Sequence, residues 1–143
     1  YDAIVSVFAH DHIPPSLAPK FAENIKRNLK KGGVYIMGGE ILPFFADEAG
    51  RKKALLDYHG YIIGQALADG NYEVAKLEID ALKSGINKQG DFKRHESMFE
   101  RELTDVGLEL FEKIKIGPTH IQNVGGVFVY VFSRKLQGTD AEK

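Results

Sequence analysis

The order of apolar and polar residues predicts a strand, a helix and a second strand at the start of the chain. Residues 2–9 are almost continuously apolar, a pattern typical of a strand covered on both faces in a parallel sheet. Residues 16–31 then carry an apolar side chain at every fourth position, which predicts a helix with Ser16 as its N-cap. Residues 34–37 are short and β-prone, and we expect this second strand to end at Gly38 and Gly39.

A strand, helix and strand in this order form a right-handed crossover in nearly all proteins. The two strands should therefore be parallel, with their carboxyl ends at the same edge of the sheet. His10, Asp11 and His12 follow the first strand, and Glu40 follows the second. We expect these four side chains to share one rim of the sheet.

The stretch from residue 43 to residue 96 has a different character. It contains two helical patterns, at about residues 47–67 and 71–83, and it is far longer than an ordinary connection between strands. A long insertion at the carboxyl edge of an open sheet is typical of a cover over a ligand site. We interpret residues 43–96 as a helical cap.

The last part of the chain predicts a short helix and a hairpin. The helix ends at Gly107, and strands are expected at residues 108–116 and 127–132. The final strand is apolar on both faces and so belongs in the sheet interior, inside the strand that precedes it. The pattern predicts an α/β fold with an antiparallel hairpin tucked into a parallel sheet, followed by a flexible tail at residues 136–143.

Composition narrows the possible functions. The 143 residues are 43% hydrophobic and 27% charged, as expected for one ordinary domain. A net charge of -1 does not favour nucleic acid or an anionic membrane as partner, and the absence of cysteine excludes disulfides and thiolate chemistry. No apolar run reaches the roughly 20 residues of a membrane span, and no signal peptide is visible. We expect a cytoplasmic protein whose natural start lies before Tyr1.

Three segments resemble class I S-adenosylmethionine-dependent methyltransferases. Residues 1–8, followed by His12, are similar to the family's fourth strand, which begins with an aromatic residue and Asp. Residues 28–36 resemble its Leu-Lys-Pro-Gly-Gly turn and fifth strand, with Lys31 in place of Pro. Residues 102–108 resemble its last helix and the turn into the sixth strand. The expected hairpin matches the family's strand order 3-2-1-4-5-7-6.

The resemblance implies the second half of that fold, at residues 1–42 and 97–135, interrupted by the cap. It also implies S-adenosylmethionine as cofactor, and we assign Phe8, Ala9 and His12 to cofactor contacts. The family's Gly-rich turn and its ribose-binding carboxylate have no counterpart here. We therefore expect a fragment that is inactive alone.

Six residues are candidates for contact with a small-molecule acceptor. They are His10, Asp11 and Glu40 on the rim, Tyr58 and His59 on the cap, and Arg94 before the last helix. Each also has a plain structural interpretation: helix capping or solvent exposure for the rim, packing for Tyr58 and His59, and a surface ion-pair cluster for residues 91–96. His10 and His12 on one side of a strand end could serve a metal, but we assign none.

The resemblance leaves the first strand at an open edge of the sheet. Fully burying one aliphatic or aromatic side chain contributes about 1.5–3 kcal/mol, so we expect this edge to be covered by a second copy or by a preceding segment. The predicted function is methyl transfer to a small molecule. The alternatives are a dimerising interaction module without catalysis, and a metal-dependent hydrolase built on His10, Asp11, His12 and Glu40.

Overall fold

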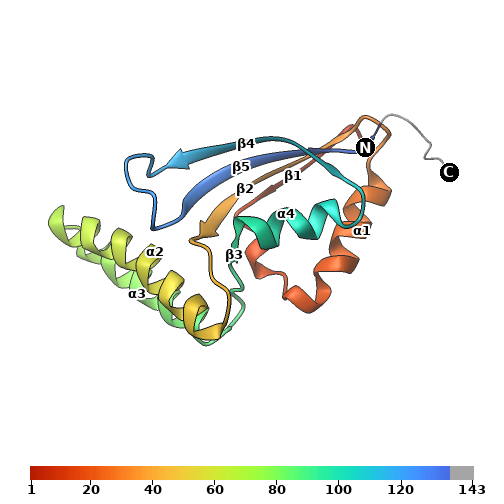
Figure 1. Ribbon diagram of the computed structural model, residues 1–143. Coiled ribbons are helices and arrows are strands. Elements are labelled where there is room, and N and C mark those ends of the chain that lie inside the picture. The colour runs from red at the N-terminus through yellow and green to blue at the C-terminus, as the bar shows by residue number, and fades with distance from the viewer. Residues whose placement is uncertain (136–143) are drawn as a thin grey trace.

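The computed structural model describes residues 1–135, and the predicted flexible tail at residues 136–143 lies outside them. Five strands and four α-helices follow one another along the chain (Figure 1). The strands are β1 (Ala3–Val7), β2 (Val34–Leu42), β3 (Arg94–His95), β4 (Glu109–Gly117) and β5 (Gly126–Ser133). The α-helices are α1 (Ala18–Asn28), α2 (Glu48–Ala68), α3 (Tyr72–Ile86) and α4 (Glu96–Thr104).

The strand order β1-β2-β5-β4 confirms the predicted sheet. β1 runs parallel to β2, whereas β5 is antiparallel to both β2 and β4 and lies between them. The short β3 adds a parallel pairing at the end of β2, opposite Ile41 and Leu42. The fold is therefore mixed α/β, with the last strand in the chain placed inside the sheet.

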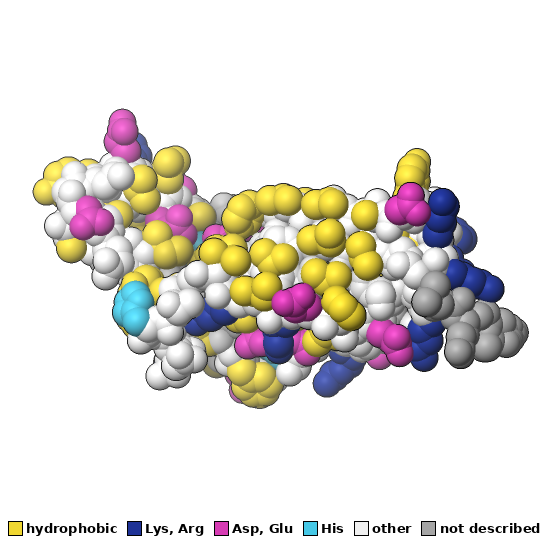
Figure 2. All heavy atoms as spheres, turned by 90° about the horizontal axis from the view of Figure 1, so that it is seen from above, with side chains coloured by type: hydrophobic (Ala, Val, Ile, Leu, Met, Phe, Trp, Pro, Cys, Tyr) yellow, Lys and Arg dark blue, Asp and Glu magenta, His cyan; other side chains and the backbone are white. Residues whose placement is uncertain are grey.

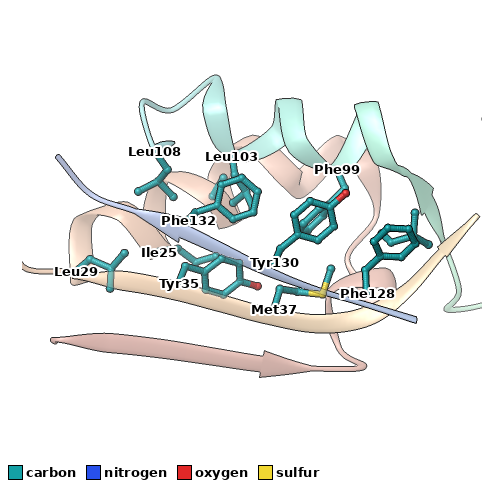
Figure 3. Packing of buried hydrophobic residues seen from close by; sticks show 12 residues of the cluster. Ile25, Leu29, Tyr35, Met37, Phe99, Leu103, Leu108, Phe128, Tyr130 and Phe132 are labelled. Carbon is teal, nitrogen blue, oxygen red and sulfur yellow. The ribbon is translucent and has the colours of Figure 1, made fainter. Parts of the chain in front are cut away.

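One face of the sheet holds the main core. α1 and α4 lie against this face (Figure 1), and aromatic side chains from β5 meet α4 there (Figure 3). Phe99 of α4 packs against Tyr130 and Phe132, with ring centroids 4.8 and 5.7 Å apart. Tyr35 and Met37 of β2 complete the same layer. Because residues alternate along a strand, the other half of each strand faces the opposite side.

No helix of residues 1–135 lies over the opposite face (Figure 1), so these residues do not supply the cover that the apolar pattern of residues 2–9 predicts on that side. Val5 and Val7 of β1 are 61% and 60% exposed. Apolar side chains gather over the middle of this face (Figure 2). The registers place Val5 beside Ile36 and Val7 beside Gly38, with valines of β5 in the same rows. The continuous apolar pattern thus belongs to a face that nothing in residues 1–135 covers.

Two predicted boundaries also differ from the structure. β2 does not end at the glycines: Gly38 and Gly39 pair with Val129 and Phe128 of β5, so the strand continues and Glu40 lies within it. The first helix begins at Ala18 rather than Ser16, because the segment after Pro14 forms a separate 3₁₀ turn (Pro15–Leu17). Ser16 does not cap the helix; the N-cap position is Leu17, which makes no side-chain cap.

The inserted residues form a helical hairpin beyond the carboxyl end of β2. α2 and α3 lie side by side and extend away from the sheet (Figure 1). Asp47 caps α2 by accepting a 2.7 Å hydrogen bond from the Gly50 amide, and Asn71 caps α3 by accepting from Val74. Leu42 of β2 packs with Leu55 and Tyr58 of α2, which joins the hairpin to the sheet.

Candidate functional site

A cavity of about 410 Å³ opens at the carboxyl ends of β1 and β2, the edge at which open α/β sheets bind ligands. Its wall comes from the ends of these two strands, from α3, and from the loop that leads into β3. The lining residues are Phe8, Asp11, His12, Glu40, Ala81, Ser84, Gln89, Gly90, Asp91 and Lys93. Three carboxylates and one lysine therefore share a small volume.

Lys93 is the buried cation of this cavity, with a side chain only 3% exposed. Its Nζ donates a 2.6 Å hydrogen bond to Oδ2 of Asp91 and lies 3.6 Å from Oε1 of Glu40. An ammonium group removed from water needs such partners to remain charged. Asp91 and Glu40 supply them, which joins the β3 loop to the end of β2.

Glu40 is held in place by the cap. The Tyr58 hydroxyl donates a 2.6 Å hydrogen bond to Oε2 of Glu40, and burial together with the Glu40 charge raises the pKa of this phenol. Tyr58 therefore stays protonated and serves as a donor. Its hydrogen bond fixes one oxygen of Glu40 and turns the other toward Lys93.

Asp11 stands at the other side of the cavity. The Phe92 amide donates a 2.7 Å hydrogen bond to the Asp11 carbonyl, which anchors the loop before β3 to the end of β1. Burial raises the pKa of the Asp11 carboxyl, and the nearby charge of Lys93 opposes that shift without cancelling it. The Asp11 carboxyl therefore has an increased affinity for a proton.

His59 of α2 is fully buried and does not line the cavity. Its Nδ1 is 2.6 Å from Oε1 of Glu78, while Nε2 has no hydrogen-bond partner among residues 1–135. Burial, assisted by the charge of Lys93, lowers the pKa of the ring. The neutral ring therefore donates from Nδ1 to Glu78 and keeps an unused lone pair on Nε2.

The structure does not bring His10 and Arg94 into the cavity. His10 lies on the core side between the rings of Phe21 and Phe99, and its Nε2 is 2.9 Å from Oε1 of Glu102. Arg94, only 2% exposed, donates from Nε to the other Glu102 oxygen at 2.8 Å. Burial raises the pKa of Glu102, but the bonds from His10 and Arg94 outweigh it and lower the pKa overall.

Two interpretations of these residues need correction. Residues 91–96 do not form a surface ion-pair cluster, because Asp91, Lys93, Arg94 and His95 are all buried. His10 and His12 do not point the same way, because they belong to a 3₁₀ turn (His10–His12) rather than to a strand. With three residues per turn, positions two apart face different sides.

Two of the residues assigned to the cofactor, Phe8 and His12, line the cavity, and Ala9 does not. Phe8 is 52% exposed and adopts a φ of 51°, which ends β1 and turns the chain, and the neighbouring Ala9 is exposed as well. His12 is exposed and makes a 2.7 Å hydrogen bond from Nδ1 to the Gly90 carbonyl. Within residues 1–135, no group of three His, Asp or Glu side chains is arranged to hold a metal ion.

Asp91 and Lys93 are the site residues that sequence reasoning did not identify. Their signal is the spacing of two, which places both side chains on one side of an extended segment. Arg94, the residue after Lys93, then faces the core. The segment's mixture of charges does not show this division, because it does not indicate that Arg94 pairs with Glu102 of the following helix or that Lys93 lies near Glu40 of β2.

No protein-family model matches the sequence, and no curated protein matches it. Among solved structures, a SAM-dependent methyltransferase from Methanosarcina mazei is similar, with 15% sequence identity and a TM-score of 0.53. The match covers 96% of this chain and 60% of that protein's chain. At this identity the likeness shows a shared fold, and it supports the methyltransferase fold that the sequence resembles.

None of the helices within residues 1–135 is long and apolar enough to cross a membrane.

Proposed function

We propose that this chain is part of a methyltransferase that moves a methyl group from S-adenosylmethionine to a small molecule. The observation that carries the proposal is β5, wedged antiparallel between β2 and β4 in a sheet similar to that of a SAM-dependent methyltransferase. The cavity at the carboxyl ends of β1 and β2 supports it, because ligands bind at that edge in such sheets.

The residues at the mouth suit one side of this cofactor. Exposed Phe8 offers an apolar surface for an adenine ring, and the carboxylates of Asp11 and Glu40 favour a nearby positive sulfonium. When bound, S-adenosylmethionine supplies an activated methyl group with its own leaving group. The family's Gly-rich turn and ribose-binding carboxylate are not among these residues. The remaining contacts to the cofactor therefore come from other parts of the polypeptide.

The chain's own residues then have modest tasks. The α2–α3 hairpin excludes water from the end of β2, Tyr58 orients Glu40, and Asp11, with its raised pKa, takes a proton from an acceptor that arrives protonated. Alignment of donor and acceptor provides most of the acceleration in such reactions. No side-chain nucleophile is required.

We further propose that the uncovered sheet face and the β1 edge pack against a preceding segment of polypeptide. This chain spans about 60% of the matched methyltransferase, so the remainder of that protein has no counterpart here. Exposed Val5 and Val7 lie on the side where such a segment would pack. A second copy of the chain bound to the same face is the alternative.

The test is a titration of the natural full-length polypeptide with S-adenosylmethionine in a calorimeter, followed by detection of S-adenosylhomocysteine with a panel of small acceptors. We expect saturable binding and acceptor-dependent product. Asp11→Asn should reduce turnover more than cofactor binding, whereas Glu73→Gln on the exposed side of α3 should change neither. Absence of cofactor binding would refute the enzyme function and favour an interaction module that uses the open face.

A further inference from the structure

We propose that the cavity at the ends of β1 and β2 binds a protonated amine of the acceptor, held by Glu40, Asp11 and Asp91. The identification of this ligand as the methyl acceptor rests on the proposed function, but the binding preference follows from the cavity itself. No bond forms in this step. The ammonium group anchors the molecule, and the preference is set by hydrogen bonds and charge.

The first argument is an excess of hydrogen-bond acceptors. Asp91 is only 8% exposed, and its Oδ1 has no partner among the described residues, although Oδ2 is bound to Lys93. Oε1 of Glu40, on a side chain that is 26% exposed, lies 3.6 Å from Lys93 Nζ, beyond hydrogen-bond distance, while Tyr58 donates to Oε2. Buried polar atoms are normally satisfied, so the unpaired Asp91 oxygen calls for a donor, and the Glu40 oxygen is open to one.

The main cationic donor of the cavity already has a partner in the protein. The Lys93 ammonium donates to Asp91 and lies near Glu40, and Nδ1 of His12 is bound to the Gly90 carbonyl. A ligand carboxylate or phosphate would compete with Asp91 for Lys93 and meet the charge of three carboxylates, with the neutral side chains of Ser84 and Gln89 as further donors. A primary ammonium group brings three donors, which matches the open oxygens.

The second argument is charge. Asp11, Glu40 and Asp91 face one another across the cavity with Lys93 as the single charged base between them, so the local field favours a cation. A divalent metal ion does not fit equally well. Within residues 1–135 no three such side chains are arranged to coordinate one ion. The carboxylate oxygens are distributed around the cavity, so that they can each accept a hydrogen bond from a different N–H group of one ammonium ion.

The experiment compares three probes of similar shape by calorimetry near neutral pH, without cofactor, on the full-length polypeptide. They are 2-phenylethylammonium, 2-phenylethanol and 3-phenylpropanoate, and magnesium chloride alone is a fourth arm. We expect the ammonium to bind about tenfold or more tightly than the alcohol, as charge-assisted hydrogen bonds require, and the carboxylate not to bind.

Two variants locate the binding. Glu40→Gln and Asp11→Asn should each weaken the ammonium complex about tenfold, with little effect on the alcohol. Glu73→Gln, which removes an exposed carboxylate from α3 outside the cavity, is the matched control and should leave all affinities unchanged. Circular dichroism checks that each variant is folded, and Asp11→Asn remains informative if Glu40→Gln unfolds.

The outcomes separate this inference from the proposed function. Equal affinity for amine and alcohol, tighter binding of the carboxylate, or magnesium binding that the two variants abolish would each overturn the amine site. Cofactor binding is measured in a separate titration. A protein that binds S-adenosylmethionine but not the amine refutes only the inference, and the reverse result refutes only the methyltransferase.

Discussion

Lys93 and Arg94 are adjacent in sequence, yet they serve opposite sides of the sheet. Lys93 reaches the cavity and pairs with Asp91, whereas Arg94 reaches the core and pairs with Glu102. The alternation of side chains in an extended segment produces this division. Each cation is buried with a carboxylate, and the loss of one partner leaves the other charge in a poor environment.

The core pair gives a prediction for stability. Glu102→Ala should lower the free energy of unfolding by about 3–5 kcal/mol, because Arg94 and His10 lose their shared acceptor inside the protein. The double variant Arg94→Met with Glu102→Leu should recover much of that loss. Urea denaturation measures both. A double variant less stable than Glu102→Ala would contradict this account of the pair.

A second prediction concerns pH and His95. Burial, and then the charge of Arg101, lowers the pKa of this ring below its usual 6.5. The folded protein therefore takes up the proton less readily than the unfolded chain. The stability that His95 contributes is fully present at pH values above 6.5, the pKa of histidine in the unfolded chain. It is lost as the pH falls through the lower pKa of the folded protein.

Urea unfolding between about pH 8 and about pH 5.5 checks this prediction. His95→Asn should reduce the loss of stability on acidification, and asparagine can still cap α4, where the His95 ring accepts from the Met98 amide. The matched control is His120→Asn, which makes the same substitution at an exposed histidine. An equal effect of the two substitutions would argue against a special role for His95.

For single residues, the sequence predicts which side chains lie at the carboxyl ends of β1 and β2, but not whether each one faces the cavity or the core. Asp11, His12 and Glu40 do line one cavity, as expected from strand ends that share an edge. His10 does not, because a 3₁₀ turn rotates it toward Phe99. Lys93 pairs with Asp91 in its own segment, but the Glu40 carboxylate near Lys93 and the Glu102 partner of Arg94 lie outside residues 91–96, and the local mixture of charges does not reveal them.

At the scale of elements, β2 and β5 determine the sheet. The apolar run of β5 correctly predicts an interior strand, because a strand with neighbours on both sides needs apolar residues on at least its core face. The same pattern predicts cover on both faces, which the described residues do not provide. The glycines of β2 mislead for a different reason: they pair within the ladder and do not form a turn.

Two glycines should respond in opposite ways to the same substitution. Gly125 has a φ of +77°, and a Cβ there would collide with the Ile41 carbonyl, so Gly125→Ala should destabilise the protein by about 1–3 kcal/mol or more. Gly60 lies in α2 with open space around it, and Gly60→Ala should stabilise by about 0.5–1 kcal/mol. Thermal or urea unfolding of both variants decides it, and two changes of the same sign would contradict the prediction.

At the scale of the whole molecule, residues 1–135 place helices over only one face of the sheet. α1 and α4 cover the core face, while the other face shows apolar side chains to solvent (Figure 2). Large exposed apolar patches are uncommon in proteins that remain monomeric. Residues 1–135 thus cover one face of their sheet with helices, and the match to the similar methyltransferase structure extends over 60% of that protein's chain.

Association of the isolated chain tests this view. The 143-residue chain alone should behave as a species larger than 15.9 kDa in sedimentation experiments, because its open face can pack on another copy. Val5→Lys with Val129→Lys, which places charges on that face, should shift the chain toward the monomer. A stable, folded monomer without these substitutions would count against the need for cover.

The position of β5 also affects the order in which the protein can be made. Synthesis proceeds from the N-terminus, so β1, β2 and β4 all leave the ribosome before β5, the strand that lies between β2 and β4. Until then β4 has no strand beside it, and one edge of β2 stays bare. A premature stop before Gly126 therefore removes the middle of the sheet rather than a dispensable end, and a chaperone that shields β2 during translation would protect the nascent chain at its most exposed stage.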